Sequence, residues 1–182
     1  LENSYRALNI ALMNEWSIFA QKNNLDLFNI IEGIKNRPTH KNIMKPGLGV
    51  GGYCLTKDPI FMNYSNIILN KQKTNFKLTN LAVQINKKMP NNSIDILDTI
   101  IKKLKKTDLF KVKFILFGVA YKDGIGDTRN SPTEAIFKKL KKNNYNFELI
   151  DPYVEKYQGK VTFNSISHVN LKKINIFVFC TK

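Results

Sequence analysis

Cysteine and histidine are scarce in this chain of 182 residues. Its two cysteines, Cys54 and Cys180, lie far apart in the sequence, which argues against a disulfide framework. With only two histidines beside them, the sequence holds no cluster of metal ligands. It also lacks an apolar run of the roughly 18 residues that a membrane span needs, and a charged-then-apolar leader. These absences predict a cytoplasmic protein with no metal and no membrane partner.

Acidic residues are few as well, 14 against 29 lysines and arginines, and the net charge is +15. A lysine-rich surface binds polyphosphate through counterion release, so a basic RNA- or DNA-binding protein is one alternative. The lysines of residues 102–106 and 138–142, however, are separated by apolar residues at helical spacing, which is typical of solvated helix faces. We therefore expect no nucleic-acid partner. A hydrophobic content of 43% indicates a folded chain with one good core or two small lobes.

Glycine is concentrated in residues 46–59, which read PGLGVGGYCLTKDP. Glycines can adopt backbone conformations that are closed to other residues, so the N–H groups of this stretch can approach a bound anion closely. Cys54 follows at once, with Lys57 and Asp58 shortly after it. A thiol beside a cation and amide dipoles is favoured as the nucleophilic thiolate. The alternative for the thiol is an inert buried cysteine. Asp58 is also predicted to cap a helix opened by Pro59, which does not exclude a second role.

The GVGGYC core resembles the catalytic loop of the UDP-glucose/GDP-mannose dehydrogenases, and is most similar to the branch that acts on UDP-N-acetylhexosamines. The resemblance implies oxidation of a sugar C6 hydroxyl to the carboxylate by NAD, through a thiohemiacetal and a thioester on Cys54. Asp58 matches the aspartate that assists proton transfer and water attack. Glucose and mannose stay open as the sugar. The loop residues implied to bind the UDP-sugar are Gly49, Val50, Gly51, Tyr53 and Lys57.

The first twenty residues carry an apolar pattern at steps of three and four, which predicts a helix. Residues 3–15 resemble the start of the family's central helix, which follows the NAD-binding domain. Asn3 matches an asparagine that polarises the reacting oxygen, and the lysine that accompanies it in the family would precede Leu1. Asp26 is predicted to cap a second helix over residues 27–35. Arg37 is matched with an arginine that reaches the substrate of a neighbouring subunit.

Two more helices are predicted, over residues 59–69 and 76–106. Pro90 interrupts the longer pattern, so we expect a kink or a break there. The apolar surface of this helix exceeds what a small lobe needs, which favours a homodimer seam. The family resemblance also implies a homodimer. The alternative is an ordinary core helix followed by a second helix after Pro90.

The periodicity changes in the last third of the chain. Residues 112–120 form a nearly continuous apolar run, as expected of a buried parallel strand. Ser131 is predicted to cap a helix, with Glu134 completing a capping box. Further strands are expected over residues 146–151, 160–163 and 174–179. The sequence thus predicts an α plus α/β protein: a central helical dimerisation region, residues 1–108, followed by an incomplete Rossmann-like UDP-sugar-binding domain, residues 109–182.

The loop of residues 120–132, AYKDGIGDTRNSP, follows a strand, where α/β sheets bind ligands. It resembles the family's second signature, which implies that Lys122 contacts the nucleotide sugar and Arg129 the cofactor. Alternatively, Arg129 pairs locally with Asp127 and Lys122 is merely solvated. Because no glycine fingerprint follows a strand, we expect a missing N-terminal domain to hold most of the NAD and the chain alone to be inactive. A non-catalytic nucleotide-sugar-binding module is the remaining alternative.

Overall fold

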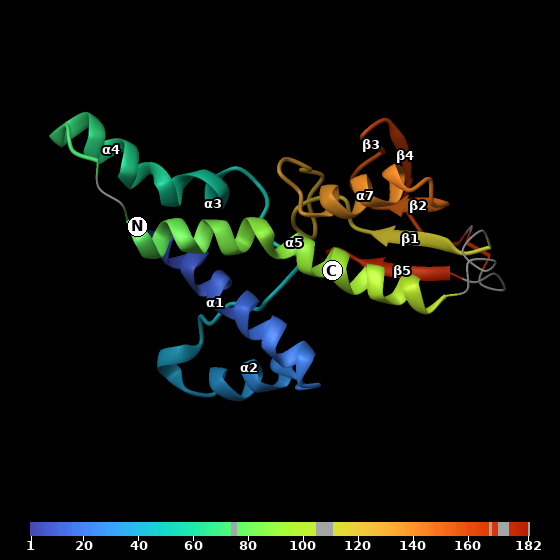
Figure 1. Cartoon of the computed structure of the whole chain (residues 1–182), viewed down its shortest axis with the longest axis horizontal. Helices are drawn as coiled ribbons and strands as arrows, with labels where there is room; N and C mark the ends of the chain where they lie inside the picture. Colours follow the sequence, from blue (N-terminus) through green and yellow to red (C-terminus); the bar gives the residue numbers. More distant parts are fainter. Residues whose placement is uncertain (74–75, 105–110, 168, 171–174, 182) are drawn as a thin grey trace. The chain divides into compact units, whose positions relative to one another are not determined.

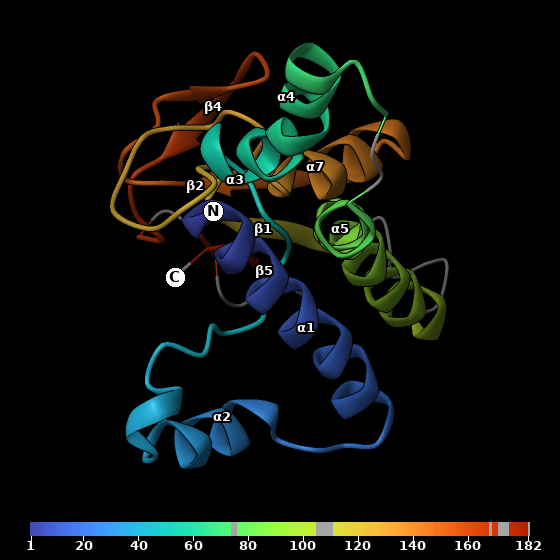
Figure 2. The same ribbon diagram turned by 90° about the vertical axis from the view of Figure 1, so that its left-hand side faces the viewer.

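The structure, a computed structural model, describes residues 1–73, 76–104, 111–167, 169–170 and 175–181 (Figures 1 and 2). Two packing units are distinguished by their contacts. The first contains Leu1–Gly49 and Tyr53–Met89, and the second contains Val50–Gly52 and the chain from Pro90 onward. The domain boundary predicted at residue 108 stays a prediction. In the described part of the chain, no helix is both long and apolar enough to cross a membrane.

The first helix, α1 (Glu2–Lys22), buries a face of small residues that includes Ala7, Ala11 and Ala20. The large apolar side chains of the periodic pattern lie elsewhere on the helix, and Trp16 and Phe19 remain 52% and 50% exposed. The apolar periodicity therefore predicts the helix correctly, but it does not identify the face of α1 that is buried in this chain. Small side chains allow close approach of neighbouring backbones, which suits the tight contacts that α1 makes with the elements that follow.

Helix α2 (Leu27–Lys35) has the predicted bounds. It begins at the predicted cap, because Asp26 Oδ1 accepts a hydrogen bond from Asn29 N at 3.0 Å. Figure 2 shows α2 after the turn that ends α1. Leu27 and Ile31 of α2 form a core with Met13 and Ala20 of α1. A short 3₁₀ helix, η1 (Pro38–His40), follows.

The glycine-rich stretch leads into a short helix, α3 (Cys54–Lys57), then η2 (Asp58–Ile60) and α4 (Phe61–Asn70). The prediction that Asp58 caps the helix after it is wrong. The chain is already helical before Asp58, and no side-chain cap bond is formed at the start of η2. The carboxylate instead accepts a hydrogen bond from Asn3.

Helix α5 (Lys77–Lys103) continues through Pro90, so a break does not occur there, and the kink that was the other predicted outcome stays a prediction. Proline removes one backbone donor, but apolar residues are buried on both sides of it, among them Met89 and Leu97. The helix contributes to both packing units, which divide at Met89 and Pro90. Residues 105 and 106 of the predicted helix lie outside the described residues.

The second unit holds a five-stranded sheet in the order β3-β4-β2-β1-β5. The strands are parallel except β3, which pairs antiparallel with β4. The predicted strands are confirmed, and β3 has only two residues, too few to give a sequence pattern. Their bounds are β1 (Lys113–Phe117), β2 (Phe147–Ile150), β3 (Lys156–Tyr157), β4 (Lys160–Phe163) and β5 (Asn175–Phe179).

Helix α7 (Thr133–Lys142) covers one face of this sheet (Figure 1). Phe137 of α7 packs edge-on against Phe147 of β2, with ring centroids 5.4 Å apart. Ser131 Oγ accepts a hydrogen bond from Thr133 N at 3.3 Å, but Pro132, not Ser131, occupies the N-cap position of α7, so the predicted cap position is off by one residue. Glu134, however, pairs with Lys138 at 2.7 Å instead of completing the capping box. Strand, loop, helix and parallel strand make the second unit Rossmann-like, as predicted.

Candidate functional site

Asn3 and Asp58 meet in the first unit. Asn3 Nδ2 donates a hydrogen bond of 2.8 Å to Asp58 Oδ2, and both residues are half-buried. The contact joins the first turn of α1 to η2, two elements that pack against each other. Two residues chosen from the sequence as members of one catalytic set are thus brought into direct contact by the fold.

Cys54 lies on the element that packs beside this pair. It is the first residue of α3, which contacts both α1 and η2, and its thiol is free and exposed. An exposed cysteine at a helix start is accessible to an electrophile, whereas a structural cysteine is buried. Of the two readings of this residue, the geometry therefore favours a nucleophile over core filling.

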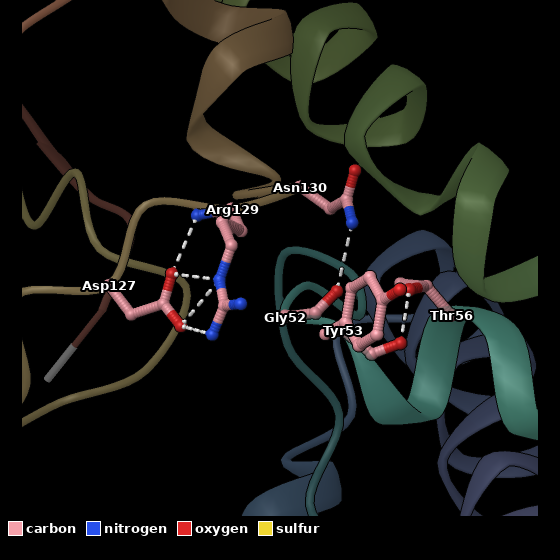
Figure 3. Close-up of polar contacts among 6 residues, drawn as sticks. All are labelled: Gly52, Tyr53, Thr56, Asp127, Arg129 and Asn130. Atoms are coloured by element: carbon pink, nitrogen blue, oxygen red, sulfur yellow. Dashed lines mark hydrogen bonds and ion pairs between the residues drawn. The ribbon is translucent and has the colours of Figure 1, made fainter.

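Lys57, at the end of α3, lies over an aromatic ring. Its Nζ is 3.6 Å from the centroid of the Tyr53 ring and 5.1 Å from that of Phe61. A cation at such a distance from a ring is attracted to the ring face. Thr56 Oγ1 donates to Tyr53 O at 3.0 Å within the same turn (Figure 3). Two of the predicted substrate-binding residues, Tyr53 and Lys57, therefore form one local cluster.

The glycines of the same stretch make a different contact in the second unit. Gly52 N donates to Arg129 O at 2.8 Å, and Asn130 Nδ2 donates to Gly52 O at 3.0 Å (Figure 3). A Cβ atom on Gly51 would lie 2.5 Å from Tyr121 Cβ and 2.7 Å from Asn130 O. Close approach of two backbones therefore requires glycine at position 51. The two family signatures, which are far apart in the sequence, are joined here by hydrogen bonds.

Arg129 itself makes the local pair that was the alternative to a cofactor contact. Its Nη2 lies 2.6 Å from Asp127 Oδ2, and its Nε donates to the same carboxylate (Figure 3). The side-chain hydrogen bonds from Arg129 lower the pKa of Asp127 below its ordinary value. The guanidinium is nevertheless exposed. The assignment of Arg129 to the cofactor stays a prediction.

Lys122 and Arg37 are both exposed. Arg37 precedes η1, where its main-chain N–H donates to Ile34 O at 3.1 Å. The substrate contacts assigned to the two residues stay predictions. Gly49 and Val50 lie on either side of the division between the units, and their roles are likewise predictions.

A dinucleotide site needs a glycine-rich turn that connects a strand directly to a helix. In the described residues, β1 is followed by a loop that runs to α7 at Thr133, and no such turn occurs. The residues present therefore do not form a cradle for the pyrophosphate of NAD. No group of three or more possible metal ligands occurs in the described residues either.

One structural carboxylate was missed by sequence reasoning. Asp151 follows β2 and is only 4% exposed. Its Oδ2 accepts from Val119 N at 2.9 Å and Ala120 N at 3.1 Å, and its Oδ1 accepts from Tyr153 N at 2.9 Å. This residue fixes the start of the loop that carries the second signature. An acidic residue directly after a buried strand was the available signal, because such a position faces the loops at that edge of the sheet.

Comparison with known proteins matches two stretches of the chain to one family. The model of the UDP-glucose/GDP-mannose dehydrogenase family, central domain, matches residues 1–88, and the model of the family's UDP binding domain matches residues 115–182. The chain is 38% identical over 157 residues to the UDP-N-acetyl-D-mannosamine dehydrogenase of Methanocaldococcus jannaschii, an alignment that covers 86% of this chain and 34% of that protein.

Solved structures agree. The structure of the UDP-N-acetyl-D-mannosamine dehydrogenase of Pyrococcus horikoshii matches with a TM-score of 0.75 and 32% identity, over 99% of this chain and 40% of that one. An NDP-N-acetyl-D-galactosaminuronic acid dehydrogenase from Methanosarcina mazei matches with a TM-score of 0.83 at 23% identity, over 99% of this chain and 39% of that one, which supports the fold alone. The chain belongs to the UDP-glucose/GDP-mannose dehydrogenase family. It spans about a third of the length of the curated relatives it matches.

Proposed function

We propose that this chain supplies the nucleophile and the UDP-sugar-binding elements of an NAD-dependent dehydrogenase that oxidises the C6 hydroxyl of a UDP-N-acetylhexosamine to a carboxylate. The observation that carries the proposal is the 2.8 Å hydrogen bond from Asn3 to Asp58, beside the helix that exposes Cys54. An amide donor, a carboxylate and an accessible thiol are the three groups that such a double oxidation needs from the protein.

The residues of the chain act in sequence on C6. Loss of a hydride from C6 and of the hydroxyl proton gives an aldehyde, and the Asn3 amide polarises its oxygen. Cys54 Sγ then adds to the carbonyl carbon, and the oxygen takes a proton, which gives a thiohemiacetal. Loss of a second hydride and a proton leaves a thioester. A water molecule that gives its proton to Asp58 attacks the thioester, the C–S bond breaks, and the carboxylic acid and the Cys54 thiolate are released.

NAD, when bound, would be the oxidant, and a separate NAD molecule would accept each of the two hydrides. We propose that it is held by a part of the enzyme other than the residues described above, since these form no dinucleotide turn. The chain alone is then expected to bind UDP-sugars without oxidising them. Arg129 is proposed to reach the cofactor, in exchange for part of its contact with Asp127.

The nature of the sugar is supported by similarity only. The relatives cited above are named for UDP-N-acetyl-D-mannosamine, and we propose an N-acetylhexosamine for this chain. The UDP group is assigned to the family's UDP binding domain, over residues 115–182. The loop of residues 120–132 follows β1, and its exposed Lys122 is proposed to contact the nucleotide sugar, as Tyr53 and Lys57 are.

A homodimer is proposed through the central helices: the seam predicted on α5, where Leu78 and Leu81 are exposed, stays part of the proposal, and the exposed apolar face of α1 is proposed to join it. Tyr5, Leu12, Trp16 and Phe19 recur at helical spacing and each is about half exposed. Trp16 and Phe19 pack edge-on against each other, with centroids 5.7 Å apart. An apolar stripe of this kind usually marks a protein interface. The arginine role proposed for Arg37, which serves a neighbouring subunit, requires such an assembly.

Mass spectrometry of the intact enzyme tests the proposed chemistry. The enzyme is incubated with NAD and each candidate UDP-sugar, acid-quenched during turnover, and digested. A sugar adduct on Cys54, absent from the Cys54→Ser variant, is expected, and that variant should form no uronate. Undiminished uronate production by Cys54→Ser would contradict the assignment. Binding of UDP-sugars without an adduct from any of them would instead favour a binding module.

A further inference from the structure

Asn14, on α1, is completely buried, and each polar atom of its side-chain amide makes a hydrogen bond. Its Oδ1 accepts from Gly47 N at 3.1 Å, and its Nδ2 donates to Asn86 Oδ1 at 3.0 Å. Asn86, on α5, is 4% exposed and donates through its Nδ2 to Ala7 O at 2.9 Å. Because a backbone N–H is only a donor, Gly47 must face the oxygen of Asn14. This leaves one orientation for each of the two amides.

Apolar side chains at positions 14 and 86 could fill this space, but they would leave Gly47 N without this acceptor. Replacing a buried hydrogen-bonded pair by apolar groups of the same shape is often nearly neutral. Leaving one member unpaired costs free energy. Apolar packing is non-directional, so it does not fix the orientation of the groups in contact. Hydrogen bonds in a buried network fix the positions of the groups that they join, and here one of those groups is the backbone of Gly47, at the start of the glycine-rich stretch.

The segment that leads into this stretch follows α1 by a series of hydrogen bonds. Asn42 Nδ2 donates to Tyr5 Oη at 3.1 Å. Met44 N donates to Asn9 Oδ1 at 2.9 Å, and Gly47 N donates to Asn14. Of the three side chains on α1, only that of Asn14 is buried. The hydrogen bond from Gly47 to Asn14, the last of the three along the chain, is therefore also the one that is most protected from water.

The far end of the stretch returns to the same helix. Asp58 accepts from Asn3, eleven residues before Asn14 on α1. At a rise of 1.5 Å per residue this spacing is about 16 Å along the helix axis. One helix thus holds Gly47, near the start of the glycine-rich stretch, and Asp58, near its end. Cys54 lies between these two anchors in the sequence.

We propose that Asn14 is a positioning residue for Cys54: by holding Gly47 it sets where the glycine-rich stretch leaves α1, while Asn86 holds the Asn14 amide in the required orientation. The consequence for catalysis rests on the proposed function. The anchoring of Gly47 does not, because it follows from the contacts of Asn14 alone.

Hydrogen exchange tests the anchor without any assay of activity. Exchange is followed by mass spectrometry in peptides that cover residues 44–57 and 27–35, for the wild type and Asn14→Ala, well below the unfolding temperature of each. We expect Asn14→Ala to raise exchange in residues 44–57 about tenfold, the factor expected from losing one net hydrogen bond, with no change in residues 27–35. Asn86→Ala removes an equally buried amide but keeps the acceptor for Gly47, so it should change residues 44–57 less.

Asn14→Asp provides a second variant in case Asn14→Ala folds poorly. It keeps an oxygen towards Gly47 N, and because burial favours the neutral carboxyl, its O–H can donate to Asn86 Oδ1. It is therefore expected to restore most of the protection. In the intact enzyme, Asn14→Ala should lower kcat about tenfold with little change in the KM for NAD, and Asn14→Asp should recover most of the rate. Unchanged exchange in residues 44–57 overturns the anchor. Raised exchange with unchanged kcat and unchanged adduct formation on Cys54 overturns the positioning role. A wild-type enzyme that forms no uronate overturns the proposed function, and the exchange comparison still decides whether Asn14 holds the loop.

Discussion

Asn3 and Asp58 are 55 positions apart in the sequence and are joined by a hydrogen bond of 2.8 Å from amide to carboxylate. The bond occupies one oxygen of the carboxylate and therefore orients it. Since α1 supplies the donor, the orientation of Asp58 depends on the first turn of a helix that is otherwise held by its small buried face. The pair can be tested separately from the thiol.

Removing the amide of Asn3 should slow the reaction without unfolding the chain. Asn3→Ala is expected to lower kcat about tenfold or more, because Asp58 loses its orienting donor and the reacting oxygen loses a polarising one. Arg6→Ala, an exposed change on the same helix, is the matched control. The measurement is the initial rate of uronate formation at saturating substrates. Equal rates for Asn3→Ala and Arg6→Ala would remove Asn3 from the reaction.

The two cysteines should differ sharply in reactivity. Burial raises the pKa of the Cys180 thiol to about 12, so this residue stays in the unreactive thiol form at neutral and mildly alkaline pH. Cys54 is exposed. Treatment of the chain with iodoacetamide at about pH 8, followed by peptide mass spectrometry, is expected to label Cys54 and leave Cys180 unmodified. Preferential labelling of Cys180 would mean that the accessibility of the two thiols has been assigned in the wrong order.

Two glycines of the same stretch should respond differently to a single methyl group. Gly51→Ala places a Cβ atom against Tyr121 and the Asn130 carbonyl, whereas Gly47→Ala meets no atom within 4 Å. Gly51→Ala should therefore displace the contact between the two signatures and weaken the binding of UDP-sugar about tenfold or more, as expected for a forced backbone shift. Gly47→Ala should bind almost as the wild type does. Isothermal titration of each variant with a UDP-sugar provides the comparison, and equal affinities would contradict the steric account.

Asp151 should be important for the stability of the α/β unit. Asp151→Asn turns an N–H group towards at least one of its backbone donors, and the resulting unpaired buried groups are expected to cost about 1–3 kcal/mol each. Glu155→Gln, an exposed change four residues later, should cost little. Urea unfolding followed by circular dichroism compares the two variants. A loss of stability no greater than that of Glu155→Gln would show that the three hydrogen bonds are dispensable.

The apolar face of α1 should govern association. Trp16→Glu is expected to weaken self-association strongly, because it puts a charge in the middle of the stripe. Lys22→Glu, at the end of the same helix, makes the larger change in charge but lies outside the stripe. Analytical ultracentrifugation over a range of concentrations measures the effect. A dimer of unchanged affinity in Trp16→Glu would place the interface elsewhere.

The helices and strands were predicted well from the sequence where their bounds depend on neighbouring residues. Helix α2 and its Asp26 cap, and strand β4, have the predicted bounds, because capping chemistry and alternation are local properties. Of the kink or break predicted at Pro90, the break does not occur, because tertiary packing carries α5 through the proline, and the kink stays a prediction. The two-residue strand β3 is held by its partner rather than by any pattern of its own.

The candidate site was predicted as a set of residues but not as an arrangement. Cys54, Asp58 and Asn3 were selected by resemblance, and the sequence alone did not indicate that Asn3 contacts Asp58 directly. Asn14 and Asp151 were missed because an asparagine inside a helix or an aspartate after a strand is usually a surface residue. Their importance comes from backbone donors that lie far away in the sequence, Gly47 for Asn14 and Val119 for Asp151. Only the folded chain brings these donors close.

The spacing of Asn3 and Asn14 on one helix has a consequence for how the chain can vary in length. Inserting or deleting a single residue between them would rotate one anchor by about 100° around the helix axis relative to the other, since an α-helix has 3.6 residues per turn. Length changes in α1 after Asn14 leave both anchors in register. Natural or engineered variants of this chain are therefore expected to tolerate insertions and deletions in the last turns of α1 or in the turn that precedes α2, and to exclude them from the eleven-residue interval that sets the two ends of the glycine-rich stretch.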